Sequence, residues 1–361
     1  MTSGTGNQSY FSVDILFGEA FDFNLEEVAD AVSSDYPEAA VDVHPVNAGK
    51  NVRTDKTVLG MFKPVDPKNG HVVLVNGTGQ PDEEFRTADH SEIAWRSGGF
   101  AHFALDAIKS HKSYITLSVQ TPDNSLKGQF RAVRQLMAVS AVFAELPISL
   151  GVLVHWSSHM LDPGTWVEGA QKAMRGDWPI SEWVSFRCGW NGGSPAREKV
   201  SVGHTKGLRN FLGFEAHIAS APIPPSDAKM LLRKACLKIL ESGKEPINGD
   251  FLRFANDPLE YRIQRPQNSD GSFGPVMVLL HPEAPELKQD KFAPTVRNAI
   301  SERMSSSQRP NPDFMKTLFA KHSANPEREK KQSQSAAQPP CVRPPLKRRS
   351  CSVSDPPRAA S

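Results

Sequence analysis

The sequence predicts an α+β fold with mixed or antiparallel sheets, helices packed on one face, and a disordered carboxyl-terminal tail. Three observations support this class. Short stretches such as 10–17 alternate apolar and polar residues with the period of a strand. Longer stretches such as 226–243 repeat their apolar residues with the period of a helix. Beyond Pro282 the chain becomes rich in Pro, Ser and Gln, which opposes a packed core.

The first 120 residues predict an amino-terminal α+β lobe. Phe11, Val13, Ile15 and Phe17 point one way, which indicates a half-buried strand. Asn24 is a suitable N-cap for a helix. The remaining expected elements are strands at 39–46, 57–65, 71–77 and 113–119 and a helix at 91–110, which Gly98 and Gly99 can break. This order is compatible with a ferredoxin-like unit that carries an extra strand.

Residues 121–284 predict a second α+β lobe. One arrangement compatible with this order of elements is a pair of ferredoxin-like lobes. We expect helices at 125–145, 163–174 and 226–243, and strands at 149–156, 181–190, 212–220, 259–266 and 275–282. All six tryptophans lie between positions 95 and 190. Because each can bury a large area, we expect them to pack at the centre of the fold.

The end of the chain predicts an interaction arm. Residues 285–304 read as a last helix or a linker, and 305–361 as a disordered, basic, Pro/Ser-rich tail with a short helix at 311–322. Residues 321–361 hold nine Lys and Arg against three Asp and Glu, whereas the whole chain has a net charge of only +2. The residues expected to contact a partner are Phe314, Leu318, Phe319, Lys347, Arg348 and Arg349.

Composition predicts a cytoplasmic protein without a membrane span. The four cysteines form no Cys-x-x-Cys pair, which suits reduced thiols. The longest apolar stretch, 136–143, is too short to cross a bilayer, and the first thirty residues lack the pattern of a secretory signal. Delivery through a carboxyl-terminal signal is compatible with the basic end, although no residue indicates it.

Four features in order resemble an uncharacterised bacterial family known as a domain of unknown function. They are Trp95 followed by HKSYITLSV, the helix that leads into ISLGVLVHW, the segment TKGLRNFLGFEAHI, and GKEPINGDFL. The third departs from the family pattern by one extra residue, Leu212. The resemblance covers residues 91–283 and implies an α+β domain, with no assigned chemistry and no catalytic residue.

The segment 203–218 concentrates glycines and polar side chains. A phosphate-binding loop is disfavoured, because Lys206 precedes Gly207 and a strand follows. On that strand Glu215 and His217 share one face. They can form an acid–base pair, or they can be two polar residues on a solvated face of the sheet. We expect the glycines to supply positive φ angles and close approach at the strand entry.

A second group of candidates consists of histidines. His155 and His159 are four residues apart, but His155 ends a strand, so a turn with hydrogen-bonded rings is the simpler interpretation. If His155, His159, His204, His217, Glu215 and Cys188 converged, they would form a zinc site. Neither a metal nor a cofactor is indicated by any established motif.

Function remains open at this level. The favoured interpretation is a non-catalytic binding or accessory protein that acts through its α+β body and the basic arm, with a protein as partner. One alternative is a hydrolase-type or metal-dependent enzyme whose weak candidate residues are Glu215, His217, His204 and His155. A second is a nucleic-acid accessory protein that binds through the tail, since the folded part is not basic.

Overall fold

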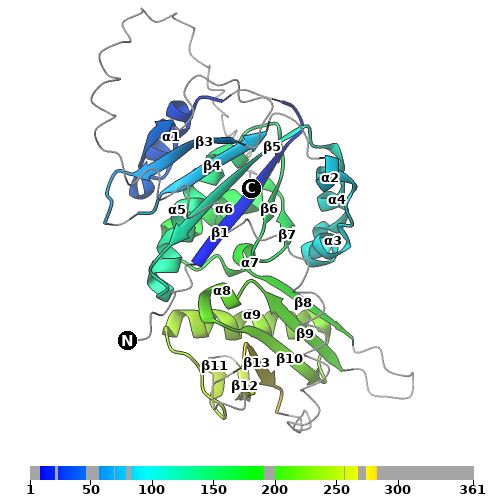
Figure 1. Ribbon diagram of the computed structural model, residues 1–361. Helices are drawn as coiled ribbons and strands as arrows, with labels where there is room; N and C mark the ends of the chain where they lie inside the picture. Colours follow the sequence, from blue (N-terminus) through cyan, green and yellow to red (C-terminus); the bar gives the residue numbers. More distant parts are fainter. Residues whose placement is uncertain are drawn as a thin grey trace, which may run out of the picture. The chain divides into compact units, whose positions relative to one another are not determined.

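The computed structural model describes residues 9–20, 23–45, 57–68, 70–78, 83–190, 200–255, 257–266 and 274–282. The chain divides into two compact units, Met1–Gln289 and Asp290–Ser361. The second unit lies wholly outside the described residues. The predicted linker, the disordered tail, its short helix and the six residues of the interaction arm therefore stay predictions. Within the first unit the fold is α+β (Figure 1).

The larger sheet, sheet A, has seven strands in the order β2-β3-β4-β5-β1-β6-β7, and every neighbouring pair is antiparallel. Its central strand β1 lies between β5 and β6. The strands are β1 (Ser9–Phe17), β2 (Val41–Pro45), β3 (Thr57–Pro64), β4 (Val73–Thr78), β5 (Ser113–Thr121), β6 (Ser149–Val154) and β7 (His159–Leu161).

Helices contact both faces of sheet A. Phe11, Val13 and Ile15 join the main core with α5 (Leu126–Ala144). On the other face Leu16 packs with Ile108 of α4 (Ala101–Ser110), so β1 is buried on both sides and the predicted half-buried strand is wrong. The other helical segments near this sheet are α1 (Leu25–Asp35), η1 (Pro37–Ala39), α2 (Glu83–Thr87), α3 (Ser91–Ser97), η2 (Gly98–Phe100) and α6 (Pro163–Met174).

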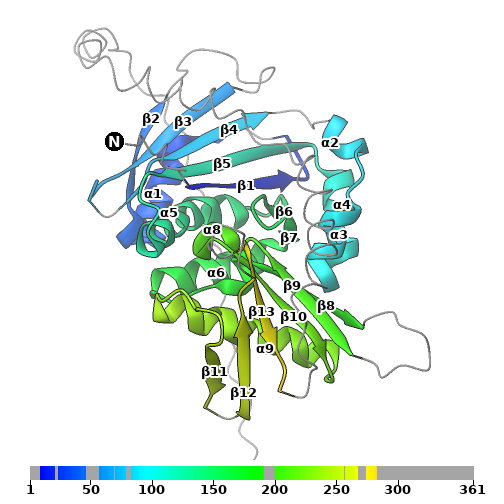
Figure 2. The same ribbon diagram turned by 60° about the horizontal axis from the view of Figure 1, so that its bottom comes forward.

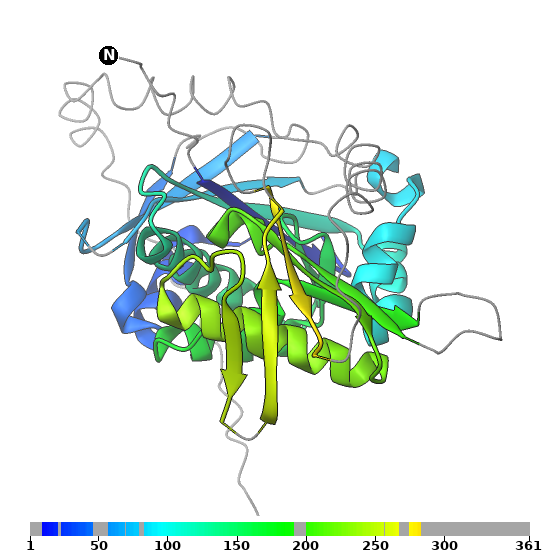
Figure 3. The same cartoon turned by 90° about the horizontal axis from the view of Figure 1, so that it is seen from below.

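Sheet B has six strands in the order β11-β12-β13-β10-β9-β8. It is mixed, because β10 and β13 run parallel while the other neighbours are antiparallel. Helix α9 (Pro225–Ser242) lies across one face (Figures 2 and 3). The strands are β8 (Ser185–Trp190), β9 (Ser201–Lys206), β10 (Glu215–Ala221), β11 (Phe251–Phe254), β12 (Asp257–Gln264) and β13 (Val276–Leu280); the short helices are α7 (Ile180–Trp183) and α8 (Arg209–Leu212).

The strand pairing corrects the predicted lobes. A boundary between residues 120 and 121 would cut sheet A, because β6 and β7 come after it and β6 pairs with β1. A ferredoxin-like unit confined to the first 120 residues does not form, because one of the two neighbours of β1 is β6, which lies beyond that boundary. The physical reason is that β1 lies inside the sheet, where the backbone groups of both its edges are paired, one edge with β5 and the other with β6.

Local signals agree with most of the predicted elements. Asn24 and Ser125 accept amide hydrogen bonds at the starts of α1 and α5. Gly98, with φ of 66°, separates α3 from α4, as the glycine pair predicts. The predicted strand 181–190 begins instead with α7, and Ser226 does not cap α9, whose N-cap is Pro224. Strands β7, β9 and β11 were not predicted.

The tryptophans do not all pack at the centre. Trp166 and Trp183 are buried in the main core, whereas Trp95 and Trp190 each keep 47% of their surface exposed. The half-exposed indole of Trp95 belongs to a cluster of side chains described below. No helix among the described residues is long and apolar enough to cross a membrane.

Candidate functional site

The segment 203–218 connects β9 to β10, and Glu215 holds this connection together. Its carboxylate accepts hydrogen bonds from the backbone amides of Gly207 at 2.8 Å and Arg209 at 3.3 Å, and from Thr205 Oγ1 at 2.6 Å. Amides at the start of a helical turn need such acceptors. Burial raises the pKa of Glu215, and the hydrogen bonds from Thr205 and the amides oppose this rise. The carboxylate thus stabilises the turn into α8.

The glycines of this segment have steric roles. Gly207 and Gly213 have φ angles of 103° and 76°, which side chains rarely adopt. Gly203 has no positive φ, but a Cβ at this position would lie 2.3 Å from Cys188 Sγ on the neighbouring strand. Positive φ is therefore confirmed at two of the three positions, and close approach at Gly203.

His204 and His217 lie opposite each other on β9 and β10, with ring centroids 5.8 Å apart. Burial lowers the pKa of His217 to about 4, so its imidazole is neutral at pH 7. Glu215 starts on the same face of β10, as its spacing predicts, but its carboxylate is engaged with the 207–209 backbone. The expected acid–base pair is therefore replaced by a structural carboxylate beside two neighbouring imidazoles, whose planes are tilted by 31°.

His155 follows the last residue of β6 in sheet A and pairs with Asp14. Its Nε2 lies 2.8 Å from Asp14 Oδ2, and Thr116 Oγ1 donates to the other carboxylate oxygen at 2.6 Å. Desolvation favours the neutral ring, but the charge and hydrogen bond of Asp14 overcome it and raise the pKa of His155 above its ordinary value. His155 is thus a partner of the central strand β1.

The predicted zinc site does not form among the described residues, where no group of three or more His, Cys, Asp or Glu side chains is placed to hold a metal ion. The register explains one part of this result. Cys188 pairs with Gly203, and Arg187 pairs with His204, so Cys188 and His204 point to opposite faces of sheet B.

A different cluster surrounds Trp95 of α3. The guanidinium carbon of Arg96 lies 5.1 Å from the centroid of the Trp95 ring, and that of Arg187 lies 5.5 Å from it. The His204 ring centroid is 5.3 Å from the same indole. Two arginines and one histidine, drawn from α3, β8 and β9, are thereby gathered around one half-exposed ring.

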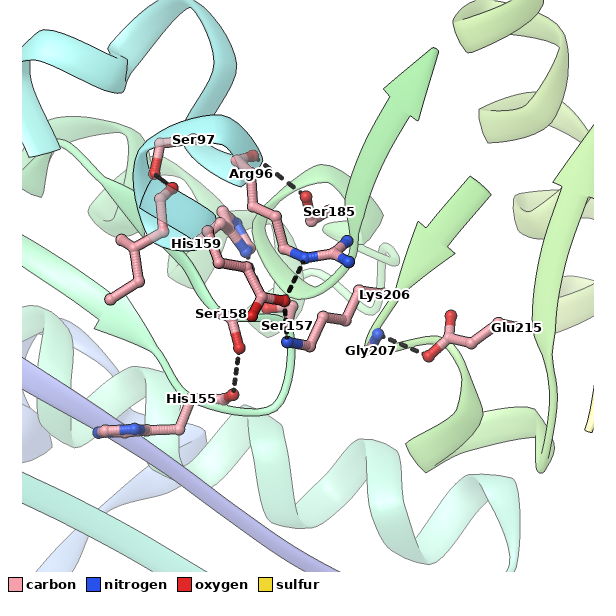
Figure 4. A network of polar contacts seen from close by, with 12 residues as sticks. Arg96, Ser97, His155, Ser157, Ser158, His159, Ser185, Lys206, Gly207 and Glu215 are labelled. Atoms are coloured by element: carbon pink, nitrogen blue, oxygen red, sulfur yellow. Dashed lines mark hydrogen bonds and ion pairs between the residues drawn. The ribbon is translucent and has the colours of Figure 1, made fainter. Parts of the chain in front are cut away.

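Hydrogen bonds fix α3 against the edges of both sheets. Ser97 Oγ accepts from the backbone amide of Met160 in β7 at 2.9 Å, and Ser185 Oγ of β8 donates to the Arg96 carbonyl at 3.1 Å (Figure 4). Because these bonds hold the backbone on both sides, the Trp95 and Arg96 side chains start from a fixed position.

One carboxylate partly neutralises the cluster. Glu92 Oε1 lies 3.0 Å from Arg96 Nε and 2.6 Å from Lys206 Nζ. Burial opposes ionisation of Glu92, but these two cations hold its pKa below the ordinary value. Arg187 has no carboxylate partner among the described residues, and no acceptor contacts its buried Nε and Nη2 atoms. Burial and the nearby Arg96 charge lower its pKa.

His159 adds a buried neutral ring to this cluster. Only 3% of its surface is exposed, Nδ1 lies 2.8 Å from Ser157 Oγ, and the buried Nε2 has no hydrogen-bond partner among the described residues. Burial, followed by the charges of Arg187, Arg96 and Lys229, lowers its pKa to about 3. Every charge that acts on His159 is positive, and its ring lies beside the Arg96 side chain (Figure 4).

This cluster was not predicted from the sequence. Arg96, His159 and Arg187 are more than twenty residues apart in every pairing, so no motif spacing connects them. The available signals were weak. Arg187 falls on the polar side of an alternating strand, and Trp95 and Arg96 precede the Gly98-Gly99 break.

The buried imidazole of His159 predicts a loss of stability in acid. Its folded-state pKa of about 3 is below the ordinary 6.5, so only the unfolded chain takes up this proton as the pH falls below about 6.5. The free energy of unfolding should drop by about 1.4 kcal/mol per pH unit for this group. We expect urea denaturation at pH 7, 6 and 5 to show a shallower pH dependence for His159→Asn than for the unmodified protein.

The comparison of the two proteins isolates His159. His155 and Glu215, whose pKa values are raised, contribute with the opposite sign, but they do so equally in both. Parallel pH profiles would contradict a neutral, buried His159.

Comparison with family models, with curated proteins and with solved structures gives no match to this chain. The resemblance of residues 91–283 to a domain of unknown function therefore stays a prediction.

Proposed function

We propose that the protein is a non-catalytic binding protein whose folded part holds an oxyanion between Arg187, Arg96 and His159. The observation that carries this proposal is the Arg187 guanidinium, whose buried Nε and Nη2 have no acceptor among the described residues. A buried donor without a partner is costly, and a charged one more so. An oxyanion supplies both the missing acceptors and the missing negative charge.

Binding fits the observations better than catalysis. Glu215 is engaged with backbone amides and His155 with Asp14, so two candidates for acid–base chemistry have structural partners. His217 is neutral at pH 7, with a pKa of about 4, and its ring lies beside that of His204. The basic arm around Lys347, Arg348 and Arg349 would give this binding protein a second contact, with a protein partner.

Removing the Arg187 charge should weaken anion binding without loss of stability. In Arg187→Met the stem remains while the guanidinium is lost. A charged hydrogen bond contributes enough that affinity for inorganic phosphate should fall by at least about tenfold. The melting temperature should stay unchanged or rise, because an unpaired buried charge is removed. Isothermal titration with phosphate and a thermal melt measure the two effects.

The matched control is Arg175→Met. Arg175 follows α6, its side chain is 63% exposed, and its contact with Asp177 is loose at 3.7 Å. This variant should bind phosphate like the unmodified protein. A destabilised Arg187→Met that still binds phosphate would assign Arg187 to the fold and refute the proposal.

A further inference from the structure

His159 brings a titratable ring into the proposed anion site. Its side chain is buried, and its Nδ1 lies 2.8 Å from the Oγ atom of Ser157, which is buried as well (Figure 4). The buried Nε2 has no hydrogen-bond partner among the described residues. One ring nitrogen is therefore engaged by Ser157, and the other is available to a bound group.

Ser157 decides which nitrogen of the neutral ring holds the hydrogen. Within the described part of the chain, its hydroxyl contacts no polar atom besides Nδ1. If Nδ1 donated to Ser157, both the hydroxyl hydrogen and the Nε2 lone pair would be buried without a partner. If the hydroxyl donates to Nδ1, only the Nε2–H group is left without one, and buried polar groups favour the better satisfied arrangement. We therefore place the hydrogen on Nε2, which is then a free donor that suits an anion.

The charges that act on His159 come from three different elements. They belong to Arg187 of β8, Arg96 of α3 and Lys229 of α9, and all are positive. Burial and these charges lower the pKa of His159 to about 3, so the ring is neutral in the free protein.

Other titratable groups of these elements keep their charge state in mild acid. Burial raises the pKa of the Cys188 thiol to about 11, so this group stays neutral. Glu92 lies between Arg96 and Lys206, which hold its pKa below the ordinary value and keep it mostly ionised. Among these groups His159 is the one whose charge a bound anion can change.

We propose that the site takes up a proton on His159 together with its anion, so that affinity for the anion rises as the pH falls. This inference rests on the proposed function, because it needs the anion site, and it adds the regulation of that site by pH. The proton adds to Nδ1, the Ser157 hydroxyl turns to accept a hydrogen bond from it, and the charged Nε2–H group donates to the anion.

The sign of the effect follows from the two states of the ring. An opposite charge beside an ionisable group moves its pKa by about one to three units toward the charged form. Without the anion the pKa of His159 is about 3 and with it the pKa is higher, so between the two values only the complex holds the proton. A rise of about two units makes binding about fourfold tighter at pH 4.5 than at pH 7.5.

The test titrates sulfate into the unmodified protein and into His159→Gln by isothermal calorimetry at pH 7.5 and 4.5. Sulfate keeps both of its negative charges over this range, whereas phosphate changes its own protonation. The unmodified protein should bind sulfate about fourfold more tightly at pH 4.5. Glutamine keeps a donor near the position of Nε2 but takes up no proton, so its affinity should be equal at both pH values. Circular dichroism checks that both proteins are folded at pH 4.5.

His217→Gln is the matched control. Burial lowers the pKa of His217 to about 4, but its ring lies on β10 beside His204. This variant should keep the pH dependence of the unmodified protein. If His159→Gln does not fold, a proton NMR titration of the His159 ring in the unmodified protein answers the same question, because sulfate should raise its pKa by at least about one unit.

The outcomes separate this inference from the proposed function. Equal sulfate affinity of the unmodified protein at both pH values would refute the proton uptake and leave the anion site intact. A pH dependence that persists in His159→Gln would assign the proton to another group and refute the inference as well. No binding of sulfate or phosphate at either pH would refute both.

Discussion

Replacing Trp183 by alanine is expected to destabilise the folded part by about 3–5 kcal/mol, the usual effect of deleting a large buried aromatic side chain. Its ring is 1% exposed and stacks on Phe211 with centroids 5.2 Å apart. Trp178 and Phe130 meet it edge-on at 5.7 Å and 5.5 Å, and its Nε1 lies 2.8 Å from Met137 Sδ. The indole therefore joins α5 and α8 in one core, and its loss leaves a cavity that cannot close easily.

Urea denaturation followed by circular dichroism measures this effect. Trp190→Ala provides the contrast, because its half-exposed ring predicts a change within about 0.5 kcal/mol. A Trp183→Ala protein as stable as the unmodified chain would mean that the packing around α8 is not part of the cooperative core.

Glu215→Ala is expected to lower the free energy of unfolding by about 3 kcal/mol, since two backbone amides and the Thr205 hydroxyl lose their acceptor. The effect should come with little change in phosphate binding, because the carboxylate points to Gly207 (Figure 4) and its hydrogen bonds go to the 207–209 turn. Chemical denaturation and phosphate titration measure the two quantities separately.

Glu215→Gln is the graded control for this prediction. Its amide oxygen can still accept a hydrogen bond from the Gly207 amide. The free energy of unfolding of Glu215→Gln should therefore fall by about half as much as that of Glu215→Ala. If alanine at position 215 left stability unchanged but removed binding, Glu215 would belong to the functional site after all, and the structural role derived from its hydrogen bonds would be wrong.

Much of the secondary structure could be predicted because it depends on near neighbours in the chain. The alternation of 10–17 predicts β1, the apolar repeat of 226–243 predicts α9, and Ser125 starts α5. The errors have a common cause. Strands β7 and β11 have only three and four residues, too few for a period to be visible, and α7 interrupts a stretch that alternates like a strand.

The candidate site was predicted less well. The sequence drew attention to Glu215, His217, His204 and His155, which are the residues with a conspicuous local spacing. Two of them, Glu215 and His155, are held by partners that no spacing could indicate, Glu215 by backbone amides and His155 by a strand more than a hundred residues away. The conspicuous local spacing therefore pointed to residues that stabilise a turn and a strand, and not to the residues of the anion cluster.

The α+β class, two helix caps, the glycine break and most helices and strands could be predicted from the amino-acid sequence, because they follow from side-chain periodicity and backbone preferences within a few residues. The pairing of β6 with β1 across the predicted boundary, and the proximity of His159 to Arg96 and Arg187, became visible in the folded chain alone. Strand order depends on which apolar faces bury each other over long distances. The balance of charge at a site depends on which side chains that burial brings together.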